Sequence, residues 1–307
     1  SYPVLLQDSD AVLRSLTIQV PLGGGGILVR GGAPELADLS VLPDPGAEIK
    51  AGYSAADLMI PFEFLDGSSP VVRDSAWTGF LYSGESSPTF EGNTITASVM
   101  AMDGPGEVVL RRNTFLGGAL IHLEFDMTGT IVDNDLTSGA IGIGDGSSMT
   151  VQDNVLRGPS LVSGGPVVFV TNPAIGVGEP GSSIVGNTIT GFDTGITIDD
   201  GAVATIEGND LTDNDVAIQW DSWETGAIEE NAVRGGNTGI VITDGDPSVT
   251  GNTVEGAGYG VSIGVEARPT LEGNTLCSSE TNLLIQDTAD PVIGENEICP
   301  DGVDSAE

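Results

Sequence analysis

Residues 184–198 read IVGNTITGFDTGITI, and this stretch decides the fold. Ile184 lies three residues before Asn187 and Ile189 lies two residues after it, while Ile196 and Ile198 form a second alternating pair. Apolar residues that alternate with polar ones are typical of β-strands with one buried face. Glycine and asparagine between such strands favour tight turns. The stretch therefore predicts several short strands joined by corners within little more than twenty residues.

The pattern around Asn187 recurs over most of the chain. Equivalent asparagines occur at 93, 113, 134, 154, 187, 209, 231, 252, 274 and 296, spaced by 20 to 22 residues except for one interval of 33. Each has an apolar residue three positions before it and another two positions after it. A unit of this length cannot bury its apolar face alone, but stacked units form a continuous core. The repeat predicts an all-β fold, a single-stranded parallel β-helix in which Asn side chains of neighbouring coils form an internal ladder. Leucine-rich repeats share the period, but they require Leu at several fixed places and a helix that these Gly-rich units disfavour.

The repeat also extends toward the N-terminus. Ser75 takes the place of the ladder Asn in one unit, and Leu39 and Leu16 take that place in two earlier units. The expected helix therefore has about thirteen coils of roughly 22 residues and forms a single domain over residues 1–307. Two intervals are too long for one coil, so we expect surface loops near 51–57 and 159–180.

Composition and charge exclude several classes of protein. The chain contains 45 Gly and 17 Pro, which is incompatible with a helical bundle. Its 45 acidic and 9 basic residues give a net charge of −36, so nucleic acids and acidic membrane surfaces are not expected partners. No apolar run is long enough to span a membrane, so membrane insertion is not expected either. The first residues carry no basic segment followed by an apolar one, and the chain reads as a mature or trimmed fragment.

The two cysteines fall at equivalent positions of adjacent repeats. Cys277 and Cys299 each follow a ladder Asn by three residues and are 22 residues apart. In a stacked helix their Cβ atoms point the same way within reach of a disulfide, although two stacked free thiols are the alternative. A disulfide would close the last two coils and indicates an extracellular, cell-surface or periplasmic location.

These repeats resemble the right-handed parallel β-helix repeats of the pectate-lyase-like superfamily. The resemblance is carried by units such as Gly186-Asn187-Thr188-Ile189 followed by Gly195-Ile196-Thr197-Ile198. It covers nearly the whole chain and implies a right-handed helix of the kind found in carbohydrate-binding proteins, sugar hydrolases and a periplasmic nitrous-oxide-reductase maturation family. Members include lyases, hydrolases, epimerases and adhesins, so the resemblance implies a fold without selecting an activity.

The catalytic motifs of these enzymes are largely missing. Of the polygalacturonase-like motifs only Asp199-Asp200 is present, because His122 is the single histidine and Lys50 the single lysine. No arginine stands in a recognisable lyase signature. The Asp-Pro pairs at 246–247 and 290–291 lack the histidine that is expected in mannuronan epimerases.

A cluster of titratable residues could still perform acid–base chemistry. In residues 119–126, ALIHLEFD, the apolar positions 119, 121, 123 and 125 are expected to face the core, which turns His122 and Glu124 outward. Asp103 is expected on the same outer face one coil earlier, and Asp199 on the same sheet further along. Carboxylates near a histidine suit glycoside hydrolysis, so these four residues are the catalytic candidates. The alternative is a solvated acidic face.

Aspartates that precede glycine at the corners are candidate calcium ligands. Asp145, Asp200 and Asp244 would stack one strand spacing apart, and bound Ca²⁺ would relieve the repulsion between them. The alternative is ordinary turn chemistry, in which Asp caps the backbone and Gly takes a positive φ. Under the first of these interpretations, calcium is the expected cofactor.

Two tryptophans flank an acidic residue in the segment QWDSWE at 219–224. Trp220 occupies an inward position and is expected in the core, whereas Trp223 lies in a corner where it could stack on a sugar ring. We expect Trp223, with Gln219 and Asp221, to form the binding surface; partial packing of Trp223 is the alternative.

The sequence favours a secreted or surface-displayed module that binds carbohydrate without catalysis. A polysaccharide-active hydrolase, lyase or epimerase is the first alternative, and a structural rod or adhesin stalk is the second. A polysaccharide or glycan is the expected partner under the favoured hypothesis.

Overall fold

The computed structural model describes residues 2–21, 23–43, 59–96, 99–144, 146–158, 166–171, 181–199, 201–278 and 280–299. These residues form β-strands, turns and bends, with no helix among them. The chain divides into two compact units, residues 1–149 and 150–307. Both are parallel β-helices built from three sheets, and each coil contributes one strand to each sheet. The expectation of a single domain stays a prediction.

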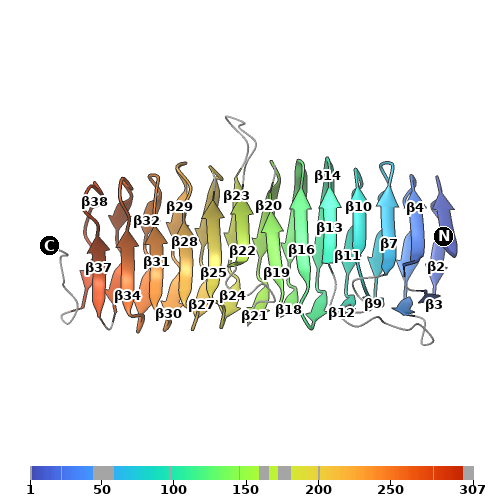
Figure 1. Ribbon diagram of the computed structural model, residues 1–307, viewed down its shortest axis with the longest axis horizontal. Coiled ribbons are helices and arrows are strands. Elements are labelled where there is room, and N and C mark those ends of the chain that lie inside the picture. The colour runs from blue at the N-terminus through green and yellow to red at the C-terminus, as the bar shows by residue number, and fades with distance from the viewer. Residues whose placement is uncertain are drawn as a thin grey trace. The chain divides into compact units, whose positions relative to one another are not determined.

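In the first unit, successive strands of each sheet come from successive coils, and every pairing between them is parallel (Figure 1). Sheet 1 contains β1 (Val4–Gln7), β4 (Gly25–Arg30), β7 (Ile60–Leu65), β10 (Leu81–Gly84), β13 (Val99–Asp103), β16 (Leu120–Glu124) and β19 (Ala140–Ile143). Sheet 2 contains β2 (Val12–Arg14), β5 (Glu35–Ala37), β8 (Val71–Arg73), β11 (Thr89–Glu91), β14 (Gly106–Arg111) and β17 (Met127–Val132). Sheet 3 contains β3 (Thr17–Val20), β6 (Ser40–Pro43), β9 (Ala76–Thr78), β12 (Thr94–Thr96), β15 (Thr114–Leu116) and β18 (Asp135–Thr137).

The second unit repeats the same order of strands. Sheet 1 contains β22 (Pro166–Thr171), β25 (Thr194–Asp199), β28 (Val216–Trp220), β31 (Thr238–Ile242), β34 (Tyr259–Ile263) and β37 (Thr281–Ile285). Sheet 2 contains β20 (Ser148–Gln152), which begins at the boundary, β23 (Ser182–Val185), β26 (Ala204–Glu207), β29 (Ala227–Glu229), β32 (Ser248–Thr250), β35 (Thr270–Glu272) and β38 (Val292–Ile293). Sheet 3 contains β21 (Val155–Arg157), β24 (Thr188–Thr190), β27 (Asp210–Thr212), β30 (Ala232–Arg234), β33 (Thr253–Glu255), β36 (Thr275–Cys277) and β39 (Glu297–Ile298).

The apolar columns that flank the ladder asparagines form the core of both units. All of these residues are buried except Ile293 and Ile298, which lie in the last coil and are 42% and 39% exposed. Inward and outward positions alternate along the strands, as in β16, because successive side chains of a strand point to opposite faces. The period-two reading of the sequence is therefore confirmed.

The asparagine ladder is present in both units. In the second unit, the backbone N–H and the side-chain Nδ2 of Asn209 both donate to Oδ1 of Asn231, each over 2.9 Å. Nδ2 of Asn231 in turn donates to Oδ1 of Asn252 and to the carbonyl oxygen of Ile206. Each buried amide is thus satisfied by its neighbours, which fixes the register of the coils.

The ladder continues past the asparagines at Ser75, as the sequence predicted. The hydroxyl of Ser75 accepts a bond from the backbone N–H of Leu39 over 3.0 Å, and its own N–H donates to Oδ1 of Asn93. A further buried asparagine that bonds between coils, Asn214, was not predicted. Oδ1 of Asn214 accepts from the N–H of Phe192, and its Nδ2 donates to the carbonyl of Ile189.

The structure describes only part of the two segments in which surface loops are expected. Residues 51–57 lie outside the described residues. Within 159–180, residues 166–171 form strand β22 and the remainder lies outside the described residues.

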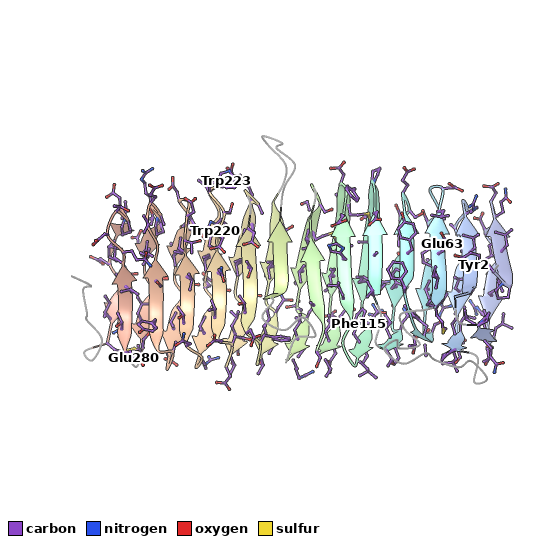
Figure 2. The ribbon with its side chains drawn as sticks, viewed as in Figure 1. Tyr2, Glu63, Phe115, Trp220, Trp223 and Glu280 are labelled. Atoms are coloured by element: carbon purple, nitrogen blue, oxygen red, sulfur yellow. A yellow bond between two sulfur atoms is a disulfide. The ribbon has the colours of Figure 1, made fainter. Side chains whose placement is uncertain are left out.

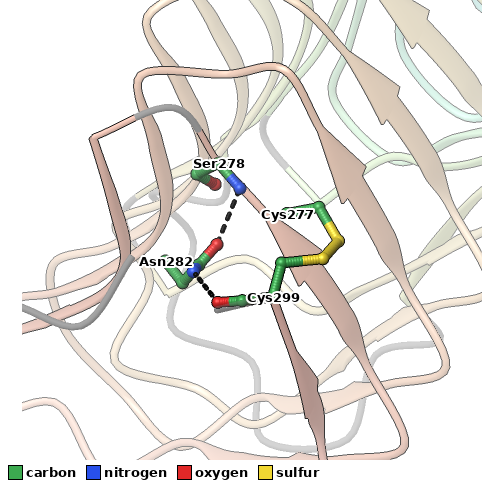
Figure 3. The surroundings of a disulfide bond; sticks show 4 residues. All are labelled: Cys277, Ser278, Asn282 and Cys299. Carbon is green, nitrogen blue, oxygen red and sulfur yellow. Dashed lines mark hydrogen bonds between the residues drawn. A yellow bond between two sulfur atoms is a disulfide. The ribbon is translucent and has the colours of Figure 1, made fainter. Parts of the chain in front are cut away.

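The predicted disulfide is confirmed. Cys277 and Cys299 are bonded, with their Cα atoms 5.0 Å apart (Figure 3). Beside the disulfide, the N–H of Ser278 donates to Oδ1 of Asn282, whose Nδ2 donates to the carbonyl oxygen of Cys299. The bond and this asparagine together attach the last coil to the coil before it.

Candidate functional site

Three of the four catalytic candidates meet on the outer face of sheet 1 in the first unit. In the pairing of β13 with β16, Asp103 stands opposite Glu124 and Ala101 stands opposite His122. Nε2 of His122 lies 3.1 Å from Oε1 of Glu124, and the two side chains are 34% and 28% exposed. The arrangement presents two carboxylates and an imidazole to a bound molecule, the groups that general acid–base chemistry uses.

One detail of the predicted pattern in this segment is wrong. Ile121 and Leu123 face the core as expected, but Phe125 is 50% exposed. The chain leaves the strand there, because Phe125 and Asp126 adopt positive φ angles of 59° and 65°. The alternation therefore ends at Glu124, where β16 ends.

The structure adds Glu63, Tyr82 and Tyr2 to this face, and the sequence analysis missed all three. Tyr82 in β10 pairs with Glu63 in β7 on one side and with Ala101 in β13 on the other. Burial, followed by the neighbouring carboxylate of Asp103 and a hydrogen bond to it, raises the pKa of Tyr82. The hydroxyl of Tyr2 donates to Glu63 (Figure 2). Tyr82 lies at the same outward-facing position of its coil as His122. This equivalence was the signal in the sequence that could have identified it.

Asp199, the fourth catalytic candidate, belongs to the second unit and ends strand β25. The predicted binding residues Gln219 and Asp221 lie nearby in chain order, at and just after β28. The backbone N–H of Asp221 donates to the carbonyl of Ile198 over 2.7 Å. Asp199 is therefore the last residue of β25, and Asp221 directly follows the paired strand β28.

The side chains of Gln219 and Asp221 form a polar group on the second unit. Nε2 of Gln219 and the hydroxyl of Thr243 both donate to the Asp221 carboxylate. These contacts hold the carboxylate in place at the end of β28 and leave an ordered set of hydrogen-bonding groups at the surface.

The two tryptophans of this segment occupy the positions that the sequence predicts. Trp220 is completely buried, and its Nε1 donates to the carbonyl of Ser222 over 2.9 Å. Trp223 is 59% exposed and lies at the corner beyond β28 (Figure 2). A Cβ atom at Gly201 would lie 2.5 Å from Cζ2 of Trp223, so the indole rests against the backbone of that glycine. Cζ2, Cε2 and Nε1 of the ring lie against that glycine, and more than half of the residue is exposed to solvent.

Only one of the three calcium candidates lies within the described residues. Asp145 and Asp200 lie outside the described residues. Oδ1 of Asp244 accepts the backbone N–H of Gly245 over 2.7 Å, and Gly245 has a φ of 76°, as turn chemistry requires. Within the described part of the chain, no group of three or more His, Cys, Asp or Glu side chains is placed to hold a metal ion.

Acidic residues on sheet 2 of the first unit have a different environment. Glu35 accepts hydrogen bonds from Arg14 and Arg73, each at 2.8 Å. The hydrogen bond from Arg73 is the main reason that the pKa of Glu35 is lowered. Glu91 similarly pairs with Arg111 and Arg112. Both carboxylates are therefore neutralised within the protein.

Comparisons with known proteins agree with the fold. A family model described as a right-handed β-helix region matches residues 119–276, just over half of the chain. The uncharacterized protein YclG of Bacillus subtilis (strain 168) is 31% identical over 97 residues, which is 31% of this chain and 17% of that protein. The chain thus matches less than a fifth of that relative's length. No solved structure matches the chain. In the described residues there is no helix with the length and apolar character needed to cross a membrane.

Proposed function

Because this chain belongs to the right-handed β-helix family, whose fold alone specifies no activity, we propose its function from its surface: a secreted or surface-displayed module that binds carbohydrate without catalysis. The exposed ring of Trp223 carries this proposal. The other two tryptophans, Trp77 and Trp220, are 1% and 0% exposed, so Trp223 alone presents an indole to solvent.

The surroundings of Trp223 support a sugar as its ligand. Sugar rings have apolar faces that stack on aromatic side chains, and their hydroxyl groups need hydrogen-bonding partners at the edge of the stack. Gly201 supports one side of the indole, while Gln219, Asp221 and Thr243 supply oriented polar groups on the adjoining strands. The net charge of −36 favours a neutral glycan over a uronate polymer.

The proposed location rests on the disulfide. The bond between Cys277 and Cys299 joins adjacent coils, and disulfides form and persist in oxidising compartments. This supports an extracellular, cell-surface or periplasmic site of action, where glycans are accessible.

Tryptophan fluorescence tests the proposal directly, because only one of the three indoles is exposed. Titration with neutral glucose or xylose oligosaccharides should shift the emission to shorter wavelength and reduce quenching by acrylamide. Trp223→Ala should abolish the response while the far-UV circular dichroism stays unchanged. Val265→Ala removes another exposed apolar side chain, 51% exposed in the same unit, and should have no effect.

Binding that persists in Trp223→Ala would contradict the proposed contact. No binding of any glycan by the wild-type chain would contradict the proposed function and favour a structural role.

The His122 cluster supports a second candidate function, a polysaccharide hydrolase or lyase. Its basis is the 3.1 Å contact between Nε2 of His122 and Oε1 of Glu124, with Asp103 on the paired strand. Under this hypothesis, incubation with polysaccharide releases reducing or unsaturated ends, and both His122→Ala and Glu124→Ala abolish the release. Glu207→Gln, which removes an exposed charge from β26, is the matched control.

A further inference from the structure

Sheet 1 of the first unit carries a second surface with the properties of a binding site, which we name the tyrosine–acid face. It consists of Glu63 on β7, Tyr82 on β10, Asp103 on β13, and His122 and Glu124 on β16. These four strands pair in that order. Neighbouring strands lie about 4.8 Å apart, so the face presents one or two functional groups at each step across the sheet.

Tyr82 forms an aromatic platform at the centre of this face. The next outward position on its strand is Gly84, and a Cβ atom there would lie 3.0 Å from Oη and 3.2 Å from Cε1 of the tyrosine. The ring therefore leans along its own strand over a position that has no side chain. Burial and the nearby carboxylate of Asp103 raise the pKa of its hydroxyl. Since glycine leaves room for the ring, Tyr82 stays only partly buried, and its ring can take part in ligand binding.

The carboxylates around this ring lack the cationic partners that other acidic residues of the unit have. On sheet 2, Glu35 and Glu91 each pair with two arginines. Glu63 instead accepts from the neutral hydroxyl of Tyr2, and the carboxylate of Asp103 lies near the hydroxyl of Tyr82, whose pKa it helps to raise. No arginine or lysine within the described residues forms an ion pair with Glu63, Asp103 or Glu124. Of the described basic residues, His122 alone contacts one of these carboxylates, Glu124, and it is charged only when protonated.

We propose that the tyrosine–acid face binds an amine-bearing carbohydrate, a short oligomer of amino sugars laid across strands β7 to β16. A protonated amine is attracted both by the face of an aromatic ring and by carboxylates, and the ring of an adjacent sugar can stack on Tyr82. Asp103 and Glu124 on adjacent strands, and Glu63 two strands before Asp103, offer acceptors to successive amines. This inference rests on the proposed function in taking the ligand to be a carbohydrate, and it adds a separate site with its own specificity.

Titration calorimetry with glucosamine oligomers of two to four residues tests the proposal, with N-acetylated oligomers of the same length as the uncharged comparison. We expect saturable binding of the amine form, and binding at least ten-fold weaker for the acetylated form. Tyr82→Ala and Asp103→Asn should each weaken binding of the amine form by about ten-fold. Asp103→Asn is nearly isosteric and keeps the surface intact if Tyr82→Ala disturbs the sheet.

Controls separate a built site from general attraction to an acidic protein. Glu207→Gln removes one exposed negative charge from sheet 2 of the second unit and should leave binding unchanged. Equal weakening by Glu207→Gln and Asp103→Asn would overturn the proposal, because it would show that net charge alone attracts the amine. Equal binding of the amine and acetylated oligomers would also overturn it.

The outcome is distinguishable from that of the proposed function. Trp223→Ala should leave amino-sugar binding intact, because Trp223 belongs to the second unit. Binding of neutral glycans that depends on Trp223, with no response of amine binding to Tyr82→Ala, would overturn this inference alone. Amine binding that depends on Tyr82, with no neutral glycan bound, would contradict the Trp223 site alone.

Discussion

Replacing Asn231 by alanine tests what the asparagine ladder contributes to stability. Oδ1 of Asn231 accepts two bonds of 2.9 Å from Asn209, and its Nδ2 donates over 2.9 Å to Ile206 and to Asn252. Asn231 is 1% exposed, so water cannot replace these partners without opening the coil. All four hydrogen bonds are lost in Asn231→Ala.

The magnitude follows from the groups that the substitution leaves behind. Nδ2 of Asn209 keeps its bonds to the carbonyls of Ile184 and Glu207, and Oδ1 of Asn252 keeps the backbone N–H of residue 231. The backbone N–H of Asn209 loses the acceptor that it had, which costs about 1–3 kcal/mol for a buried group. The remaining lost bonds contribute about 0.5–1.5 kcal/mol each and are not additive. We therefore expect a loss of about 3 kcal/mol in the free energy of unfolding.

Urea unfolding followed by circular dichroism measures this loss, with an unchanged dependence on urea concentration showing that the unfolded state is comparable. Asn237→Ala is the matched control, because Asn237 is exposed in the same unit and should tolerate the change within about 0.5 kcal/mol. If Asn231→Ala costs no more than Asn237→Ala, the ladder does not hold the coils together and the reasoning is refuted.

Three further predictions concern other parts of the structure. Reduction of the Cys277–Cys299 bond should destabilise the last coil by about 3 kcal/mol, which would be measured as faster amide hydrogen exchange in β38 and β39. Unchanged exchange rates in these strands would contradict this. Because Arg73 lowers the pKa of Glu35, the stability contributed by that pair is present above the unfolded-state pKa of about 4.3 and is lost as the pH falls through the lower folded-state value. Glu35→Gln should therefore make the loss of stability with falling pH less steep, and the measurement is made at low salt because salt screens this exposed pair. An identical dependence of stability on pH in the wild type and the variant would exclude this contribution. Gly129→Ala should lower the free energy of unfolding, measured in urea, by about 3 kcal/mol or more, because φ is 139° and the new Cβ would lie 1.9 Å from a backbone oxygen of the adjacent strand. A free energy of unfolding close to that of the wild type would contradict the assigned register.

The fold was predictable because one physical requirement recurs in every coil. A buried asparagine needs partners above and below it, and this forces the same residue type to return at the coil length, where it can be read directly from the sequence. Ser75 could be placed in the ladder because Val72 and Trp77 repeat the apolar flanks of the asparagines, and its hydroxyl supplies an acceptor at that position. Asn214 was missed because it bonds between coils as a single asparagine and therefore establishes no period.

The candidate sites were predictable only where local alternation defines them. His122 and Glu124 lie in one strand, so their shared outward face follows from residue spacing. Their association with Tyr82 and Glu63 depends on pairing between coils, and the irregular interval after residue 43 obscures the register there. For Phe125 the alternation itself gave the wrong prediction. The backbone turns after Glu124, so Phe125 is exposed although the alternating pattern places it in the core.

Binding of carbohydrate without chemical change is the central claim, and one measurement tests it most directly. The intact chain is incubated with a panel of neutral, amino-sugar and uronate oligosaccharides, and both bound ligand and newly released sugar ends are quantified in the same samples. The account predicts saturable binding of neutral and amine-bearing oligomers, weak binding of uronates, and no released ends. Release of reducing or unsaturated ends, or the absence of binding to every oligomer, would contradict it.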